Sequence, residues 1–301
     1  MNVLSLFDGM SCGQIALNKL GIVVDNYFAS EIKENAIKVT QYNYPNTIQL
    51  GDVKSLTDEK LESLPKIDLL IGGSPCQDLS PAMKKRKGLK GSKSQLFWEY
   101  IRVLNKIKPK YFLLENVARM KNEDKEVINE TLGVKPIRIN SKLVSAQLRD
   151  RLYWTNLPNV SLPKDRGIKL EHVLENGFTD REKSRALLAS DSRPLKSKEK
   201  MWHRYKNTGF TTIVFENGIE DTHNIRYLNQ VELERLQTVP SGYTKILNRN
   251  QAADLLGDGW TVDVIAHLFK GLKEEYIMKE VNLDSAQNTE LDELYIEQIT
   301  V

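Results

Sequence analysis

The chain has 301 residues, of which 40% are hydrophobic, enough for the core of one large domain or two modest ones, so a disordered or fibrous protein is excluded. No apolar run approaches the roughly 18 to 20 residues of a membrane span. Lys and Arg exceed Asp and Glu by 43 to 40, but residues 274–301 hold eight acids and one Lys, so the rest carries a formal charge of +10 and is expected to attract a polyanion.

Short apolar runs alternate with amphipathic stretches from residue 2 to about residue 155. This pattern predicts an α/β fold in which a parallel sheet is covered by helices on both faces. The connections between strands are expected to be βαβ crossovers. Strands are predicted at residues 3–7, 26–30, 47–50, 67–71 and 111–114, and helices at residues 14–20, 35–44 and 96–107.

A polar group follows each predicted strand. Asp8, Glu31, Asp52, the turn at residues 72–76 and the pair Glu115-Asn116 all fall at carboxyl ends. Ligands of open α/β sheets bind in the crevice at that edge, so the sequence predicts that these segments converge on one site.

The second half of the chain is less regular. Residues 158–243 are interrupted by Pro and Gly and predict a smaller, loop-rich domain. Helical or buried spacing returns after residue 250, so residues 1–157 and 244–301 are expected to form the main domain. The acidic stretch 281–301 carries only scattered apolar residues and predicts a disordered tail.

Two cysteines, Cys12 and Cys76, cannot form a disulfide framework. The first residues also lack the basic and apolar segments of a signal peptide. A reducing compartment, the cytoplasm or a nucleus, is therefore expected, and the cytoplasm is the prediction.

The segment 7–13 follows a strand and opens a helix, so its glycines would let a ligand approach the helix N-terminus. It departs from G-x-G-x-x-G, which argues against a dinucleotide. Glu31 can accept hydrogen bonds from ribose hydroxyls and Asp52 from an adenine amino group, so together they predict a nucleoside pocket. Either acid taken singly is more often a helix cap or a solvated group.

Cys76 lies on a Gly- and Pro-rich turn at the predicted crevice, where its thiolate could act as a nucleophile. A buried, inert cysteine is the alternative. Glu115 follows the next strand, so its carboxyl group is expected beside this turn as a proton donor or acceptor. A structural salt bridge is the alternative there.

Polar residues alternate in the segment 147–151, so Gln147, Arg149 and Arg151 would share one face of a strand. Two guanidinium groups there could bind a carbonyl oxygen or a phosphate. The loop 81–93 is basic and punctuated by glycines, which predicts a mobile lid that closes on a phosphate backbone. Exposed basic surface is the alternative for both segments.

This ordered set resembles the DNA (cytosine-5) methyltransferases. The resemblance rests on six segments in family order: Phe7-Asp8-Gly9, Ser74-Pro75-Cys76-Gln77, Glu115-Asn116-Val117, the Gln147, Arg149 and Arg151 strand, residues 226–243, and residues 256–262. Details such as Arg86-Lys87-Gly88-Leu89 and a short recognition region are similar to the animal de novo subgroup. The closing segment has Asp258 where many members carry Asn.

The resemblance implies a Rossmann-like methyltransferase sheet with a small target recognition domain at residues 158–243. It implies that S-adenosylmethionine donates a methyl group to carbon 5 of a cytosine flipped out of double-stranded DNA, with no metal. The catalytic residues would be Cys76, Glu115, Arg149 and Arg151. The cofactor would be bound by Phe7, Asp8, Gly9, Gly13, Glu31, Ile32, Asp52, Val53, Pro75, Asp258 and Trp260. The DNA would be bound by Gln77, Ser80, Lys84, Lys85, Arg86, Lys87, Arg185, Arg193 and Arg204.

Three alternatives stay open at this point. A tRNA cytosine methyltransferase would use the same catalytic set. A catalytically silent homologue is disfavoured because Cys76, Glu115 and Arg151 are all present. An NAD-dependent oxidoreductase should show the dinucleotide glycine pattern.

Overall fold

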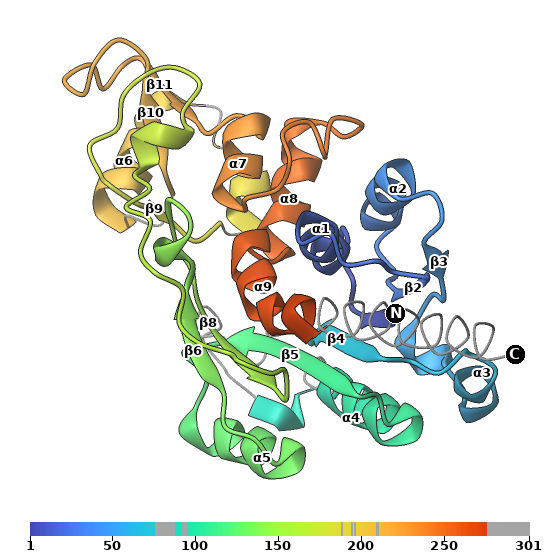
Figure 1. Cartoon of the computed structure of the whole chain (residues 1–301). Helices are drawn as coiled ribbons and strands as arrows, with labels where there is room; N and C mark the ends of the chain where they lie inside the picture. The colour runs from blue at the N-terminus through green and yellow to red at the C-terminus, as the bar shows by residue number, and fades with distance from the viewer. Residues whose placement is uncertain are drawn as a thin grey trace, which may run out of the picture.

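A computed structural model describes residues 1–75, 88–91, 95–187, 189–193, 195, 197–208 and 211–275. This part of the chain contains a seven-stranded sheet (Figure 1). The order of its strands is β3 (Ile48–Gln49), β2 (Asn26–Ser30), β1 (Asn2–Leu6), β4 (Leu69–Gly73), β5 (Tyr111–Val117), β8 (Asp150–Thr155) and β6 (Ile137–Asn140). Strands β3 to β5 are parallel neighbours, whereas β8 is antiparallel to both β5 and β6.

Helices cover both faces of the sheet, and each face has its own apolar core. Along β4, Leu69 and Ile71 belong to one core and Leu70 to the other, as the alternation of side chains requires. The first face is covered by α1 (Cys12–Lys19), α2 (Glu34–Asn43), α8 (Arg249–Asp258) and α9 (Val262–Leu268). The second is covered by α3 (Asp58–Glu62), α4 (Leu96–Ile107) and α5 (Asn122–Leu132).

Single turns of 3-10 helix join several of these elements. They are η1 (Val53–Ser55), η2 (Gly88–Lys90), η3 (Ser141–Leu143), η4 (Leu170–Val173) and η5 (Ala189–Ser192).

The predicted α/β architecture with helices on both faces is confirmed. The expected strand 26–30 and the expected helix 96–107 have the observed bounds of β2 and α4. β4 runs on to Gly73, two residues beyond its expected end. The end of β5 was also predicted wrongly, because this strand runs on to Val117 and Glu115 therefore lies inside it. The added residues pair with β8, which comes from more than 30 residues later in the chain, so no local pattern signals them.

The prediction that Gln147, Arg149 and Arg151 share one strand is also wrong. The chain divides there into β7 (Gln147–Leu148) and β8, and the N–H of Arg149 donates to the carbonyl oxygen of Gln147 in the tight turn between them. The two strands have different neighbours. β7 pairs with β9 (Ser184–Arg185), whereas β8 pairs inside the main sheet.

The loop-rich region is only partly separate from the main body. It contains β9, α6 (Lys198–Thr208), β10 (Ile213–Phe215), β11 (Ile225–Tyr227) and α7 (Gln230–Leu236). A small core of its own is formed by Met201, Tyr205, Ile213, Phe215 and Ile225. Buried residues on either side of it, among them Leu170, Leu233 and Tyr243, belong instead to the first core of the sheet. The domain division at residues 158 and 243 stays a prediction.

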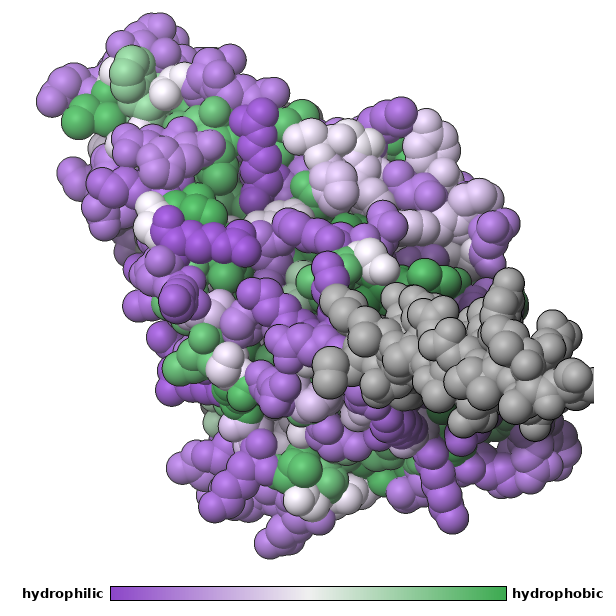
Figure 2. Space-filling view, viewed as in Figure 1, coloured by the Kyte–Doolittle hydropathy of each residue, from purple (hydrophilic) through white to green (hydrophobic). Residues whose placement is uncertain are grey.

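The surface agrees with the composition. In Figure 2 the visible face is mainly hydrophilic, with apolar groups in small separate areas. None of the helices within the described residues is both long enough and apolar enough to cross a membrane.

A pair of glycines tests the packing of the two chain segments that flank the loop-rich region. A Cβ at Gly271 would lie 2.1 Å from the carbonyl oxygen of Pro158, a backbone atom, whereas a Cβ at Gly257 would meet nothing closer than 3.8 Å. We expect Gly271→Ala to lower the free energy of unfolding by about 1–3 kcal/mol through overpacking. Gly257→Ala, on helix α8, should leave it unchanged or raise it by up to about 1 kcal/mol. Urea unfolding of both variants measures this, and equal stabilities would contradict the packing.

Candidate active site

The loop between β1 and α1 is held in an unusual conformation. Phe7 and Ser11 have φ angles of 57° and 60°, in the left-handed region that side chains rarely adopt. Asp8 fixes the loop, because its carboxylate accepts a hydrogen bond from the hydroxyl of Tyr27 at 2.8 Å and another from Ser11. Burial raises the pKa of the Asp8 carboxyl to about 6, although hydrogen bonds from Ser11, Ser5 and Tyr27 act to lower it.

Glu31 joins this loop to the start of α2. Its Oε2 accepts from the N–H of Gly9 at 2.7 Å, and its Oε1 accepts from the N–H groups of Ile32 and Lys33, both at 2.8 Å. A carboxylate offers about four acceptor positions, so these bonds leave one, on Oε2. The adjacent Ile32 side chain is 71% exposed, which gives an apolar surface beside a free acceptor.

The other residues predicted to bind the cofactor differ in exposure. Asp52 is exposed and caps η1, with Oδ1 accepting from the N–H of Lys54 at 3.0 Å. Val53 is buried in the second core, and Gly13 packs against Ile71 on β4. The hydroxyl of Ser30 donates to the carbonyl oxygen of Gly51 at 2.7 Å, so the ends of β2 and β3 are tied together. The structure thus brings the segments after β1, β2 and β3 to one edge of the sheet.

The turn after β4 is anchored to β5. The side-chain amide of Asn116 donates to the carbonyl oxygen of Ser74 at 3.2 Å and to its hydroxyl at 3.1 Å. Both residues are buried, and Pro75 follows directly. Cys76, the predicted nucleophile, is bonded to Pro75 but lies outside the described residues, as do Gln77, Ser80, Lys84, Lys85, Arg86, Lys87 and the predicted tail at 281–301.

Glu115 lies one residue before Asn116, and both oxygens of its carboxylate have partners. Oε1 forms an ion pair with Nε of Arg151 at 2.8 Å, and Oε2 accepts from the indole N–H of Trp260 at 3.1 Å. The Glu115 side chain is 11% exposed and the Arg151 side chain 16%. A charged pair is thus held largely shielded from solvent at this end of β5.

Arg149 lies in a different place from Arg151. Its side chain is buried, and its Nη2 donates to the carbonyl oxygens of Gly257 and Gly259 at 3.0 and 2.9 Å. The sequence led us to expect both guanidinium groups at the same substrate. Among the predicted catalytic residues that the structure describes, it brings together Glu115 and Arg151 and directs Arg149 to the segment that precedes Trp260.

Asp258 also makes a contact that the sequence did not indicate. Its carboxylate, which is 62% exposed, forms an ion pair with Lys33 at the start of α2. Lys33 follows the predicted cofactor residues Glu31 and Ile32. The end of α8 therefore lies beside the start of α2, next to the predicted cofactor residues. The ion pair that joins the two helices is exposed, and exposed ion pairs contribute little to stability.

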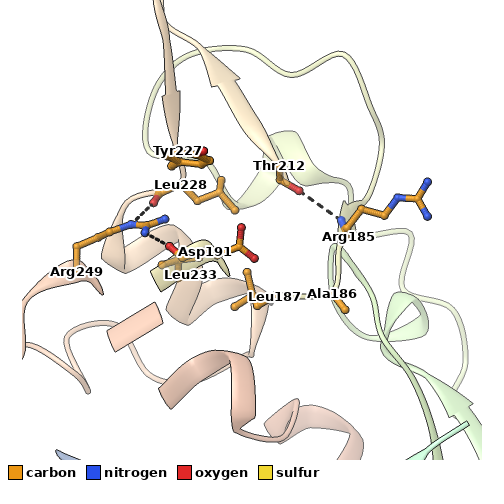
Figure 3. A pocket seen from close by; sticks show the side chains of 9 residues that line it. All are labelled: Arg185, Ala186, Leu187, Asp191, Thr212, Tyr227, Leu228, Leu233 and Arg249. Carbon is orange, nitrogen blue, oxygen red and sulfur yellow. Dashed lines mark hydrogen bonds between the residues drawn. The ribbon is translucent and has the colours of Figure 1, made fainter. Parts of the chain in front are cut away.

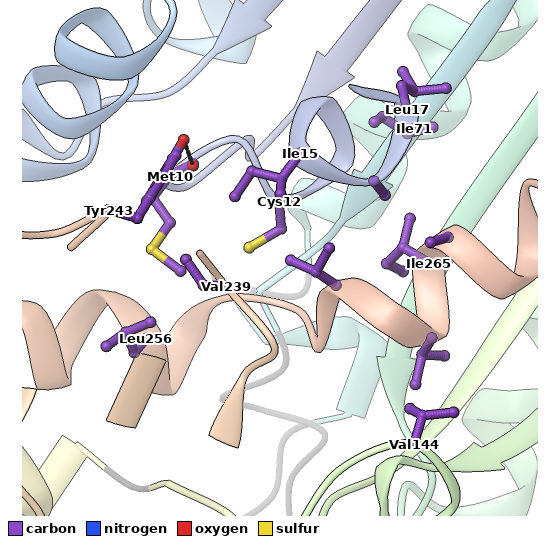
Figure 4. Packing of buried hydrophobic residues seen from close by; sticks show 14 of the residues in the cluster. Met10, Cys12, Ile15, Leu17, Ile71, Val144, Val239, Tyr243, Leu256 and Ile265 are labelled. Carbon is purple, nitrogen blue, oxygen red and sulfur yellow. Dashed lines mark hydrogen bonds between the residues drawn. The ribbon is translucent and has the colours of Figure 1, made fainter. Parts of the chain in front are cut away.

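Tyr243 supports the β1–α1 loop from the other side. Its hydroxyl donates to the carbonyl oxygen of Met10 at 2.8 Å (Figure 4). Around this bond Met10, Cys12, Val239 and Leu256 belong to the first core. Sequence reasoning missed this contact and that of Trp260 with Glu115, since both join residues that are far apart in the chain.

A small cavity lies elsewhere, between the loop-rich region and α8 (Figure 3). It offers about 10 Å³, which is the space of one water molecule and far less than a nucleoside needs. Its lining residues are Arg185, Ala186, Leu187, Asp191, Thr212, Tyr227, Leu228, Leu233 and Arg249. The side chain of Arg185 points away from this cavity in Figure 3 and is exposed, as is that of Arg193, whereas Arg204 is half-buried on α6.

Comparison with known proteins shows the family to which the chain belongs. The profile described as C-5 cytosine-specific DNA methylase matches residues 1–153, half of its length. The chain belongs to this family. An orphan methyltransferase of Bacillus phage rho11s, M.Rho11sI, is 33% identical over 192 residues, which are 60% of this methylase chain and 36% of the phage protein. The type II methyltransferase M.NgoBV of Neisseria gonorrhoeae is 32% identical over 200 residues, which are 58% of this chain and 46% of that protein.

The matches to these two relatives therefore span less than half of their lengths. Solved structures resemble the methylase over nearly all of its length. The Entamoeba histolytica methyltransferase EhMeth has a TM-score of 0.71 at 18% identity, covering 92% of this chain and 98% of that one. A mutant of Spodoptera frugiperda DNMT2 has a TM-score of 0.64 at 19% identity, covering 90% and 99%. At such identities the likeness shows the fold alone.

The raised pKa of Asp8 predicts a dependence of stability on pH. Between about pH 4 and pH 6 the folded protein keeps the Asp8 proton while the unfolded chain has lost it, so the free energy of unfolding falls as pH rises. A difference of about two pKa units corresponds to about 3 kcal/mol. The stability of the wild type relative to Asp8→Asn should fall by about this amount from pH 4 to pH 7. Urea unfolding at a series of pH values measures it, and parallel curves for the two proteins would contradict it.

Proposed function

We propose that this chain transfers a methyl group from S-adenosylmethionine to carbon 5 of a cytosine flipped out of double-stranded DNA. One observation carries the proposal. The ion pair of Glu115 with Arg151 lies beside the Ser74-Pro75 turn, and the residue after that turn is Cys76. A carboxyl group, a guanidinium group and a thiol are the groups needed to activate a pyrimidine ring.

The geometry after β1 and β2 fits the methyl donor that this family uses. The remaining acceptor position of Glu31 suits one ribose hydroxyl, which is fewer than the sequence had led us to expect. The exposed Ile32 side chain next to it suits the apolar face of an adenine. S-adenosylmethionine bound there would supply an electrophilic methyl group.

The chain's own residues then have distinct roles. The Cys76 thiolate attacks carbon 6 of the cytosine and forms a covalent bond to the ring. Glu115 in its protonated form donates that proton to ring nitrogen 3, and Arg151 binds the carbonyl oxygen, so the charge that develops on the ring is neutralised. After carbon 5 has gained the methyl group, it loses its proton to a base, nitrogen 3 returns its proton to Glu115, and the thiolate leaves to give 5-methylcytosine.

The substrate must be opened before this chemistry, because a stacked base hides the atoms that react. We infer that the loop containing Lys84, Lys85, Arg86 and Lys87 and the exposed arginines of the loop-rich region hold the opened duplex through its phosphates. Arg185 and Arg193 offer such contacts because both are exposed. Gln77, Ser80 and Arg204 complete the proposed interface.

The cellular setting is part of the same proposal. The sequence relatives reported above come from a phage and a bacterium, so we propose that the protein works in the cytoplasm of a bacterium or of a phage-infected cell. They lend no support to the finer resemblance to the animal de novo subgroup. A cognate restriction enzyme is a further proposal, tested by searching the flanking DNA for a nuclease of the same specificity.

Substitution of Cys76 tests the nucleophile. Cys76→Ser should abolish methyl transfer and leave the affinity for S-adenosylhomocysteine within about threefold, because the hydroxyl is a far weaker nucleophile at neutral pH. The assay is tritiated-methyl incorporation into duplex DNA, with tRNA as the competing substrate. Cys12→Ala should still become trapped on 5-fluorocytosine DNA, whereas Cys76→Ser should not. Full incorporation by Cys76→Ser would refute the assignment, and preference for tRNA would refute the substrate.

Substitution of Glu115 tests the proton donor. Glu115→Gln keeps the shape of the side chain but cannot exchange a proton, so the kcat of methyl transfer should fall at least about 100-fold. The exposed Glu62, which pairs with Lys106, provides a matched control, and Glu62→Gln should keep the wild-type kcat. If the kcat of Glu115→Gln equals that of the wild type, Glu115 is not the acid.

A further inference from the structure

The contact of Trp260 with Glu115 is not explained by the expected role of Trp260 in cofactor binding. The indole N–H donates to Oε2 of Glu115 at 3.1 Å, while Arg151 binds the other oxygen at 2.8 Å. A carboxylate bound at one oxygen can still turn about its side-chain torsions. A carboxylate bound at both oxygens from different elements has one orientation.

The end of β4 is shaped to allow this contact. A Cβ at Gly73 would lie 2.9 Å from Nε1 of Trp260, closer than real Cβ atoms come to such neighbours, and 3.0 Å from Oε2 of Glu115, which is tighter than most real contacts. Any larger residue would therefore crowd both side chains and force at least the indole to shift. The backbone of β4 packs directly against both partners, which also limits the space in which Glu115 can move.

Trp260 is itself held in place. Arg149 binds the carbonyl oxygens of Gly257 and Gly259, and the amide of Gln237 donates to Gly259 O at 3.3 Å. On the other side of Trp260, the hydroxyl of Thr261 donates to Oε1 of Gln237 at 2.9 Å. Arg149, Gln237 and Thr261 are all buried, so the peptide on each side of the indole is fixed within the protein.

We propose that Trp260 is a positioning residue for the carboxyl group of Glu115, and that Arg149 acts on the same carboxyl group through Trp260. The proposal rests on the proposed function, in which Glu115 donates a proton to the cytosine. Arg149 and Arg151, two residues apart, then serve one group by different routes. Arg151 binds Glu115 directly, and Arg149 fixes the backbone that carries the indole.

Trp260→Phe is the first test, because it removes the N–H donor while keeping an aromatic ring for the cofactor. Loss of a hydrogen bond to a charged group should lower kcat about 10- to 100-fold. The dissociation constant of S-adenosylhomocysteine, measured by calorimetry, should change less than about threefold. Trp98→Phe on α4 removes an exposed indole and should keep the wild-type kcat. An unchanged kcat in Trp260→Phe, or a loss explained by weaker cofactor binding, would overturn the proposal.

A double-mutant cycle tests whether Trp260 acts through Glu115. In the Glu115→Gln background, Trp260→Phe should lower the remaining kcat by less than about twofold, since the carboxyl group that Trp260 positions has been replaced by an amide that cannot donate a proton. If the two losses multiply, Trp260 acts independently of Glu115 and the proposal fails.

The indole N–H signals in a ¹⁵N–¹H spectrum test the contact without any activity. The chain has four Trp residues, and the signal of Trp260 is the one that Trp260→Phe removes. Glu115→Gln should shift that signal and leave those of Trp98 and Trp202 unchanged. An unmoved signal would overturn the positioning role even in an active enzyme. If the wild type fails to methylate DNA but Glu115→Gln still shifts the Trp260 signal, the proposed function is refuted and the contact is kept.

Discussion

The antiparallel pairing of β8 with β5 determines where the charged groups of the site meet. In this register Arg151 lies opposite Val117, and Tyr153 lies opposite Glu115. Side chains two residues apart on a strand share a face, so Glu115 and Arg151 are diagonal neighbours across the pair and their side chains can form an ion pair. A shift of the register by one residue would place Arg151 on the opposite face of the sheet. The sheet, and not a loop, therefore sets the geometry of this pair.

The segment around Trp260 completes the same site from the face of the sheet that α8 and α9 cover. Trp260 lies between α8 and α9, which cover the face that carries Leu113 and Tyr153. The first core thus lies beneath the indole, and Tyr243 and Met10 extend it to the loop after β1. One continuous apolar core supports both the predicted cofactor loop and the contacts of Glu115. The predicted cofactor loop and the contacts of Glu115 therefore have little freedom to move independently of each other.

Sequence reasoning predicted the parts of this arrangement that local patterns encode. Strand β2 and helix α4 were predicted with their observed bounds because alternating or helical apolar spacing is visible within a few residues. The location of Asp8, Glu31 and Asp52 at neighbouring strand ends followed from the parallel sheet. Arg149 binds Gly257, which lies 108 residues further along the chain, and Glu115 binds Trp260, which lies 145 residues further along. Contacts at such separations depend on packing of the whole chain, which no local window contains.

The small core of the loop-rich region has a consequence for how such a protein can change. Met201, Tyr205, Ile213, Phe215 and Ile225 pack together and belong to neither of the cores that flank the sheet. Substitutions among them alter a separate hydrophobic unit and leave the support beneath Glu115 and Trp260 intact. Changes within this cluster are therefore separated from the apolar support of the sheet, so the surface loops around it can vary while the packing beneath Glu115 and Trp260 stays the same.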